Sequence, residues 1–193
     1  MSDAALDPIA IDVGSLVQKT VTSLYSHLVT RPTGRAVRMA IETQLSGVCE
    51  RSLSIIDLSE VTILDYSCAD EVVAKLLQRY LHESMHEAFF VFCGVREAHR
   101  DQIQVVLERQ SLIAVAETEP SGFELLGAAE PVEEASWRTL EQHGLVTTEE
   151  LIDLFPEEDP RSALDQLVER RVAFQSPISG CYHALSRLVE HLL

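Results

Sequence analysis

The side chains with the clearest chemical pattern are His82, Glu83 and His86, which match H-E-x-x-H. On a helix the two imidazoles would share one face and could bind Zn²⁺, with the glutamate as general base. Such a site needs helix on both sides, but the strand-like run AFFVFC begins two residues after His86. The sequence therefore argues against a bound metal, and a zinc hydrolase is the third of three functional hypotheses.

Other catalytic patterns are absent from the sequence. It contains no G-x-S-x-G, no phosphate-binding G-x-x-x-x-G-K-[ST] and no G-x-G-x-x-G motif. Cys181 and His183, two residues apart, would lie on one side of a strand and are typical of packing positions. The four cysteines show no C-x-x-C spacing and indicate reduced thiols. We therefore expect no cofactor and no enzymatic activity.

A second candidate site is the turn Asp65–Cys68. Ser67, with Asp70 and Glu71 after it, matches the S-x-x-[DE] signal for a helix start, so its hydroxyl is expected to cap the helix. A helix N-terminus also tolerates negative charge, which leaves regulation by a phosphoryl group at Ser67 as the alternative. Tyr66 is either a loop aromatic or a partner contact, since aromatic residues are enriched at interfaces.

The elements that position this turn follow an alternating pattern. A strand-like run at residues 9–13 is followed by residues 17–30, which suit a strand or a helix equally. Strand-like runs that are apolar on both faces indicate parallel strands covered by helices. The expected strands are 52–58, 88–93 and 112–116, and the expected helices are 33–45, 69–81 and 97–110.

The composition changes at residues 118–134, a stretch rich in glutamate with proline and glycine, which predicts an acidic linker. Three short helices are expected beyond it, followed by two short strands within 172–184 and a last helix. Thr147 and Glu150 fit a capping box, and Asp159-Pro160 fits an N-cap followed by proline in the first turn. The expected helices are 135–143, 148–155 and 160–171.

The segment IIDLSEVTILDYSCADEVVAKLL, residues 55–77, resembles the STAS (anti-sigma-factor antagonist) family. In that family a buried strand ends in Asp-Leu-Ser, and a hydrophobic step leads to an Asp-Ser-Ser-Gly loop that caps the next helix. The resemblance covers about residues 20–117. It implies a protein-binding domain in which a kinase commonly phosphorylates the serine after the loop aspartate. Here Tyr66 follows Asp65, the second serine is Ser67, and Cys68 replaces the glycine.

The segments GLVTTEEL, LDQLVERRVAF and SGCYHAL resemble a winged helix in their rhythm. The expected fold class is therefore α/β, a STAS-like sheet of largely parallel strands with covering helices, plus a small, mostly α winged-helix-like domain. The expected domains are residues 1–117 for the STAS-like part, 118–134 for the linker and 135–193 for the winged-helix-like part.

The net charge of −16 argues against nucleic acid and anionic lipid as partners, because both are polyanions. Residues 160–171, the would-be recognition helix, offer Arg161, Arg170 and Arg171 against Asp165 and Glu169. No apolar run approaches the roughly 20 residues needed to span a bilayer. The acidic start of the chain lacks the pattern of a secretory signal, so the expected location is the cytoplasm.

The leading hypothesis is a non-catalytic bacterial signalling adaptor of the anti-sigma-factor-antagonist type, which works by protein–protein binding. The resemblance implies a protein partner, an anti-sigma-type kinase or another regulator, with Asp65, Tyr66, Ser67 and Cys68 as the binding or regulatory residues. The tail would be a second interaction surface or would form a homodimer. A winged-helix transcriptional regulator is the alternative.

Overall fold

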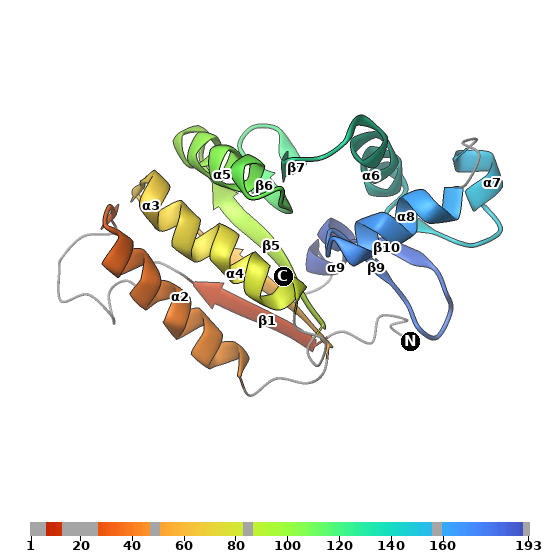
Figure 1. Ribbon diagram of the computed structural model, residues 1–193. Helices are drawn as coiled ribbons and strands as arrows, with labels where there is room; N and C mark the ends of the chain where they lie inside the picture. Colours follow the sequence, from red (N-terminus) through yellow and green to blue (C-terminus); the bar gives the residue numbers. More distant parts are fainter. Residues whose placement is uncertain (1–6, 13–26, 47–50, 83–86, 156–159, 191–193) are drawn as a thin grey trace.

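A computed structural model describes residues 7–12, 27–46, 51–82, 87–155 and 160–190 (Figure 1). Its main sheet has five strands in the order β1-β3-β5-β6-β7. The first four strands are mutually parallel, and β7 runs antiparallel to β6. This confirms the predicted mixed α/β class with a largely parallel sheet. The strands are β1 (Asp7–Asp12), β3 (Arg51–Asp57), β5 (Glu87–Val95), β6 (Ile113–Thr118) and β7 (Gly122–Gly127).

Both faces of this sheet are buried, which explains why its central strands are almost continuously apolar. Successive side chains of a strand point to opposite faces, so each strand supplies two separate cores. One core lies under a layer of helices, and the other lies under residues 131–190, here called the C-terminal segment. In β5 the first core takes Ala88, Phe90 and Phe92, and the second takes Phe89, Val91 and Cys93.

The helix layer consists of α2, the continuous run α3–η1–α4, and α5. Figure 1 shows α2 beside the α3–α4 run on one side of the sheet. The helix predicted for residues 69–81 is present but begins three residues earlier, and η1 is a π-helical turn within it. The bounds are α2 (Arg31–Leu45), α3 (Tyr66–Ala69), η1 (Asp70–Ala74), α4 (Lys75–Leu81) and α5 (Glu97–Arg109).

Two short strands lead into these helices. β2 (His27–Leu28) precedes α2, and β4 (Ile63–Leu64) precedes α3. They pair with each other in parallel, so the starts of the two helices are held side by side. The end of the ambiguous stretch 17–30 is therefore a strand, while residues 17–26 lie outside the described part of the chain.

The prediction of an acidic linker at residues 118–134 was wrong. Residues 122–127 form β7, the edge strand of the main sheet, and α6 begins at Pro131. The proline and glycine residues that suggested a linker mark turns. Pro120 and Gly122 lie in the β6–β7 hairpin, and Gly127 ends the strand at a φ of 104°, which favours glycine.

The C-terminal segment has the predicted three helices, hairpin and last helix. The hairpin strands β9 and β10 are joined by a third strand, β8, in the order β8-β10-β9. Thr147 and Glu150 make the two hydrogen bonds of a capping box, at 3.0 Å and 3.4 Å, but in the turn before α7, whose N-cap is Glu150. The elements are α6 (Pro131–His143), β8 (Leu145–Val146), α7 (Leu151–Leu154), α8 (Pro160–Glu169), β9 (Ala173–Gln175), β10 (Tyr182–Ala184) and α9 (Leu185–Glu190).

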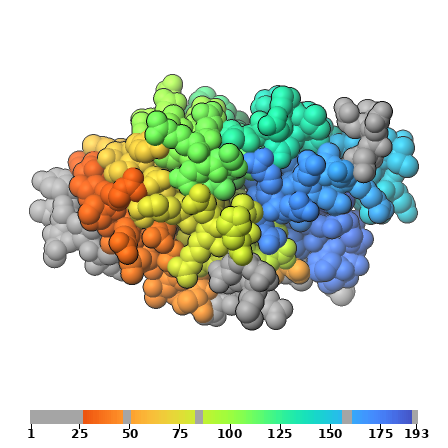
Figure 2. All heavy atoms as spheres, in the orientation of Figure 1, coloured from red at the N-terminus to blue at the C-terminus, as the bar shows by residue number. Residues whose placement is uncertain are grey.

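The C-terminal segment packs directly on the second face of the sheet. In Figure 2 its blue atoms adjoin those of the rest of the molecule. Phe89 of β5 meets Phe174 of β9 edge to face, with ring centroids 5.6 Å apart. Arg171 lies over the Phe89 ring at 5.4 Å and pairs with Glu87 at 2.6 Å. The segment thus shares a core with the sheet.

Candidate functional site

Asp65, rather than Ser67, caps the helix that begins at Tyr66. The Asp65 carboxylate accepts the Cys68 backbone N–H at 2.9 Å and the Ser67 hydroxyl at 2.9 Å through the same oxygen, Oδ1. The prediction of a Ser67 cap was wrong because the helix starts at Tyr66, two residues earlier than a cap at Ser67 allows. Ser67 instead donates a hydrogen bond to the capping carboxylate, so the turn is a well-defined structure with Asp65 at its centre.

Tyr66 lies back against the helix layer. Its ring is half-buried on the first core, and its hydroxyl accepts a hydrogen bond from Arg109 of α5 at 3.1 Å. The Arg109 guanidinium carbon also lies 5.3 Å from the centre of the ring, which is a cation–π distance. Tyr66, expected to be either a loop aromatic or a partner contact, is the first residue of α3 and is held in place with only part of its surface exposed.

Cys68 joins this turn to the start of α2. Its buried thiol donates to the Thr30 carbonyl at 3.0 Å. Burial, together with the negative charge of Asp65, raises the pKa of Cys68 to about 11, so the thiol stays protonated at neutral pH. Gly34 of α2 makes the close approach possible, because a Cβ there would lie 2.9 Å from the Cys68 Cα. Cys68 is thus a packing residue and a hydrogen-bond donor.

The two acidic residues that follow the turn were missed as a site. Asp70 and Glu71 were assigned only to the helix start, yet both are buried, with side chains 11% and 3% exposed. Arg31 of α2 bridges them, at 2.5 Å to Asp70 and 3.1 Å to Glu71. Lys75 also pairs with Glu71. Arg38 adds a contact to Glu71 at 3.3 Å.

This charged network ties the three helices of the layer together. Gln110, just after α5, donates to Asp70 at 2.5 Å, so α2, η1 and α5 all meet at this carboxylate. Burial alone would raise the pKa of Glu71, but hydrogen bonds from Lys75 and Arg31 outweigh it and hold that pKa below its ordinary value. π-helical turns are frequent at functional sites, and η1 begins at Asp70, close to the Asp65–Cys68 turn. Sequence spacing shows only the Lys75–Glu71 pair, because the other partners of the two carboxylates lie 33 to 40 residues away in the chain.

A groove of about 320 Å³ opens beside the turn, between β4 and the first half of α5. Its volume is at the lower end of the range for small-molecule pockets. Ile63 at the groove is 44% exposed and so offers apolar surface there. The groove is lined by Thr62, Ile63, Leu64, Asp65, Ala98, His99 and Gln102.

The H-E-x-x-H motif is described only at its first residue. His82 follows α4 as its C-cap and is exposed, and β5 begins at Glu87. Glu83 and His86 lie outside the described residues. Within the described ranges no three His, Cys, Asp or Glu side chains are grouped as a metal would require.

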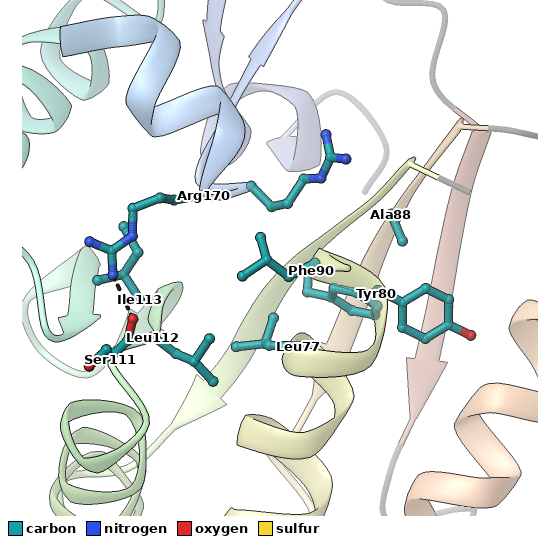
Figure 3. Close-up of a pocket in the computed structure, with 10 residues that line it drawn as sticks. Leu77, Tyr80, Ala88, Phe90, Ser111, Leu112, Ile113 and Arg170 are labelled. Atoms are coloured by element: carbon teal, nitrogen blue, oxygen red, sulfur yellow. Dashed lines mark hydrogen bonds between the residues drawn. The ribbon is translucent and has the colours of Figure 1, made fainter. Parts of the chain in front are cut away.

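Two of the three arginines expected on a recognition helix, Arg170 and Arg171, pair with residues of the main sheet and of α6. Figure 3 shows Arg170 extended toward the Ser111 carbonyl, to which it donates at 3.0 Å. It also pairs with Glu133 at 2.8 Å. The cavity beneath Arg170 and Arg171 measures about 20 Å³, room for about one water molecule.

The surface of α8 therefore offers little to a phosphate backbone. The helix ends at Glu169, before Arg170 and Arg171. Its exposed charges are Arg161 against Asp165 and Glu169. Since duplex binding depends largely on neutralising phosphates, this face is poorly suited to DNA.

Among the described residues, no helix has the length and apolar character needed to cross a membrane. Comparison of the chain with protein-family models, with curated proteins and with solved structures finds no match.

Proposed function

We propose that this protein is a non-catalytic, cytoplasmic signalling adaptor that binds a protein partner through the Asp65–Cys68 turn and the surface beside it. The observation that carries the proposal is the turn itself. A capped helix start and a half-exposed tyrosine are fixed in place next to an open groove with an exposed isoleucine. Rigid aromatic groups beside an apolar groove are typical of the anchor points of protein interfaces.

The polar groups of the turn are engaged in structure, which favours binding over chemistry. The Asp65 Oδ1 atom accepts two hydrogen bonds within the turn, and the Cys68 thiol is protonated and bonded to a carbonyl. A nucleophilic thiol would need a lowered pKa, whereas that of Cys68 is raised. These groups hold the shape of the surface that a partner would meet.

The same geometry would allow modification of Ser67 to change the structure of the turn. Its hydroxyl is bonded to Asp65 at 2.9 Å. A phosphoryl group on Ser67 would remove this bond and place a second anion beside the carboxylate that caps the helix. Modification would therefore loosen the turn, and we propose that an anti-sigma-type kinase or another regulator acts on it in this way.

A pull-down followed by binding measurements tests the proposal. Tyr66→Ala should weaken binding of the captured partner by at least about fivefold, which corresponds to about 1 kcal/mol for an interface aromatic residue. Ile178→Ala is the matched control, because Ile178 is 75% exposed in the β9–β10 turn, away from the surface in question. Equal loss in both variants, or no loss in Tyr66→Ala, would count against the turn as the binding surface.

A further inference from the structure

The groove between β4 and α5 has the features of a docking site for one particular kind of partner segment. Its lining has an apolar side chain on each side, the exposed Ile63 on the strand side and Ala98 on the helix side. Asp65 is the one carboxylate or cation among its lining residues. An aliphatic side chain would therefore fit the groove, and a positive charge would be favoured at its end.

His99 contributes a buried imidazole to the groove lining. The side chain is 1% exposed, and neither ring nitrogen has a hydrogen-bond partner that meets geometric criteria among the described residues. Burial lowers the pKa of His99 and the charge of Arg96 lowers it further, while a contact with the Thr62 backbone opposes them, so the ring is neutral at neutral pH. Because both ring nitrogens are buried, His99 shapes the groove as an uncharged packing group.

The rim of the groove carries two carboxylates on α5, while the neighbouring exposed Arg96 donates to the Ser59 carbonyl at 2.8 Å. Glu97 and Asp101 are exposed in the first turns of α5, and neither forms a salt bridge in the described part of the chain. Asp101 follows Ala98 by three residues, so the two lie on neighbouring positions of the same helix face. With the net charge of −16, this rim favours a cationic partner.

We infer that this groove binds an extended segment of the partner protein that carries an aliphatic side chain next to a lysine or arginine. The aliphatic group packs on Ile63 and Ala98, and the cation lies against Asp65 and Asp101. The inference rests on the proposed adaptor function and specifies the chemistry of the partner at that surface.

The first test uses a defined probe, N-acetyl-leucyl-lysine amide, added to the ¹⁵N-labelled full-length chain. Backbone amide resonances of Ala98, His99 and Gln102 should shift and approach saturation at millimolar probe. N-acetyl-alanyl-lysine amide and N-acetyl-leucyl-glutamine amide should each bind more weakly, because each lacks one of the two features. Shifts spread over the whole acidic surface, or equal for all three probes, would overturn the inference.

Matched variants separate groove binding from general attraction to an acidic protein. Ile63→Asn should weaken the probe at least about fivefold, whereas Val105→Asn, at an exposed α5 position outside the groove lining, should not. Asp101→Asn should weaken it about threefold, as expected for loss of a surface ion pair, and Asp153→Asn on α7 should leave it unchanged. Equal effects within either pair would contradict the inference.

The two proposals can fail separately. If a captured partner loses affinity in Tyr66→Ala but binds Ile63→Asn and Asp101→Asn like the unmodified protein, the groove is not its docking site and the adaptor function stands. If the partner is indifferent to all three changes, the adaptor surface itself is misplaced.

Discussion

The Ser67 hydroxyl donates a hydrogen bond to Oδ1 of Asp65, the same carboxylate oxygen that accepts the Cys68 backbone N–H. The two residues therefore have unequal roles. Asp65 satisfies a backbone N–H at the start of the helix, and Ser67 only orients Asp65. This order of dependence determines how the turn should respond to mutation.

Loss of the capping carboxylate of Asp65 should lower stability more than loss of the Ser67 hydroxyl that orients it. We expect Asp65→Ala to lower the free energy of unfolding by about 1 kcal/mol, since a backbone N–H of the first turn loses its acceptor. Ser67→Ala should change it by no more than about 0.5 kcal/mol. Urea denaturation monitored by circular dichroism compares the two directly. A larger effect of Ser67→Ala would restore serine as the principal cap.

Glu71 should be important for stability, although the sequence pattern predicted it only as part of a helix start. Glu71→Gln removes the carboxylate that Arg31, Arg38 and Lys75 share, so we expect a loss of about 2 kcal/mol in the free energy of unfolding. The control is Glu149→Gln, at an exposed position ahead of α7, which should change stability by less than about 0.5 kcal/mol.

The stability difference between the unmodified protein and Glu71→Gln should depend on pH. Because the folded-state pKa of Glu71 lies below its ordinary value of 4.5, the unfolded chain takes up the proton first as the pH falls. The contribution of Glu71 is therefore complete above pH 4.5 and is lost as the pH falls through the folded pKa. Unfolding curves of both proteins at a series of pH values should converge below pH 4.5; a constant gap would contradict the ion-pair explanation.

Gly34 should resist even the smallest substitution. Alanine normally favours a helix by about 1 kcal/mol over glycine. At this position its Cβ would lie 2.9 Å from the Cys68 Cα and 3.2 Å from the Glu71 Cβ, so α2 must move away from the turn. We expect a net loss of about 2 kcal/mol in Gly34→Ala and almost none in Arg35→Ala, which is exposed on the same helix. Thermal unfolding would reveal the difference, and a stabilised Gly34→Ala would show that the helices are not in close contact.

Arg170 should stabilise the contact between the C-terminal segment and the sheet. Arg170→Ala removes both hydrogen bonds to the Glu133 carboxylate and those to the Ser111 and Ala128 carbonyls. The expected loss is about 3 kcal/mol, since Glu133 remains buried and loses its ion-pair partner. Arg161→Ala, on the exposed face of α8, is the control and should have little effect. Similar stability of the two variants would mean that the segment is held by its apolar contacts alone.

The class of fold could be predicted from the sequence because it depends on local patterns. The runs at Ser52–Leu58 and Ala88–Cys93 are apolar on both faces. Both faces of their sheet must therefore be buried, although the pattern does not say by which elements. The helices at 33–45 and 97–110 carry their apolar residues at helical spacing, and both are present. The residue types and spacing along one short stretch contain all of this information.

Pairings between distant segments were decided only by the tertiary structure. The apolar second face of β5 did not reveal that it packs against Phe174, because burial specifies no partner. The glutamates and glycines of 118–134 gave the composition of a linker, and only pairing with β6 makes 122–127 a strand. Asp70 and Glu71 were predicted merely to begin a helix, since the cations that neutralise them on α2 are some 30 to 40 residues away in the chain. Hydrogen bonds and ion pairs depend on distances in space, and a sequence fixes those distances only within a helical turn or a strand.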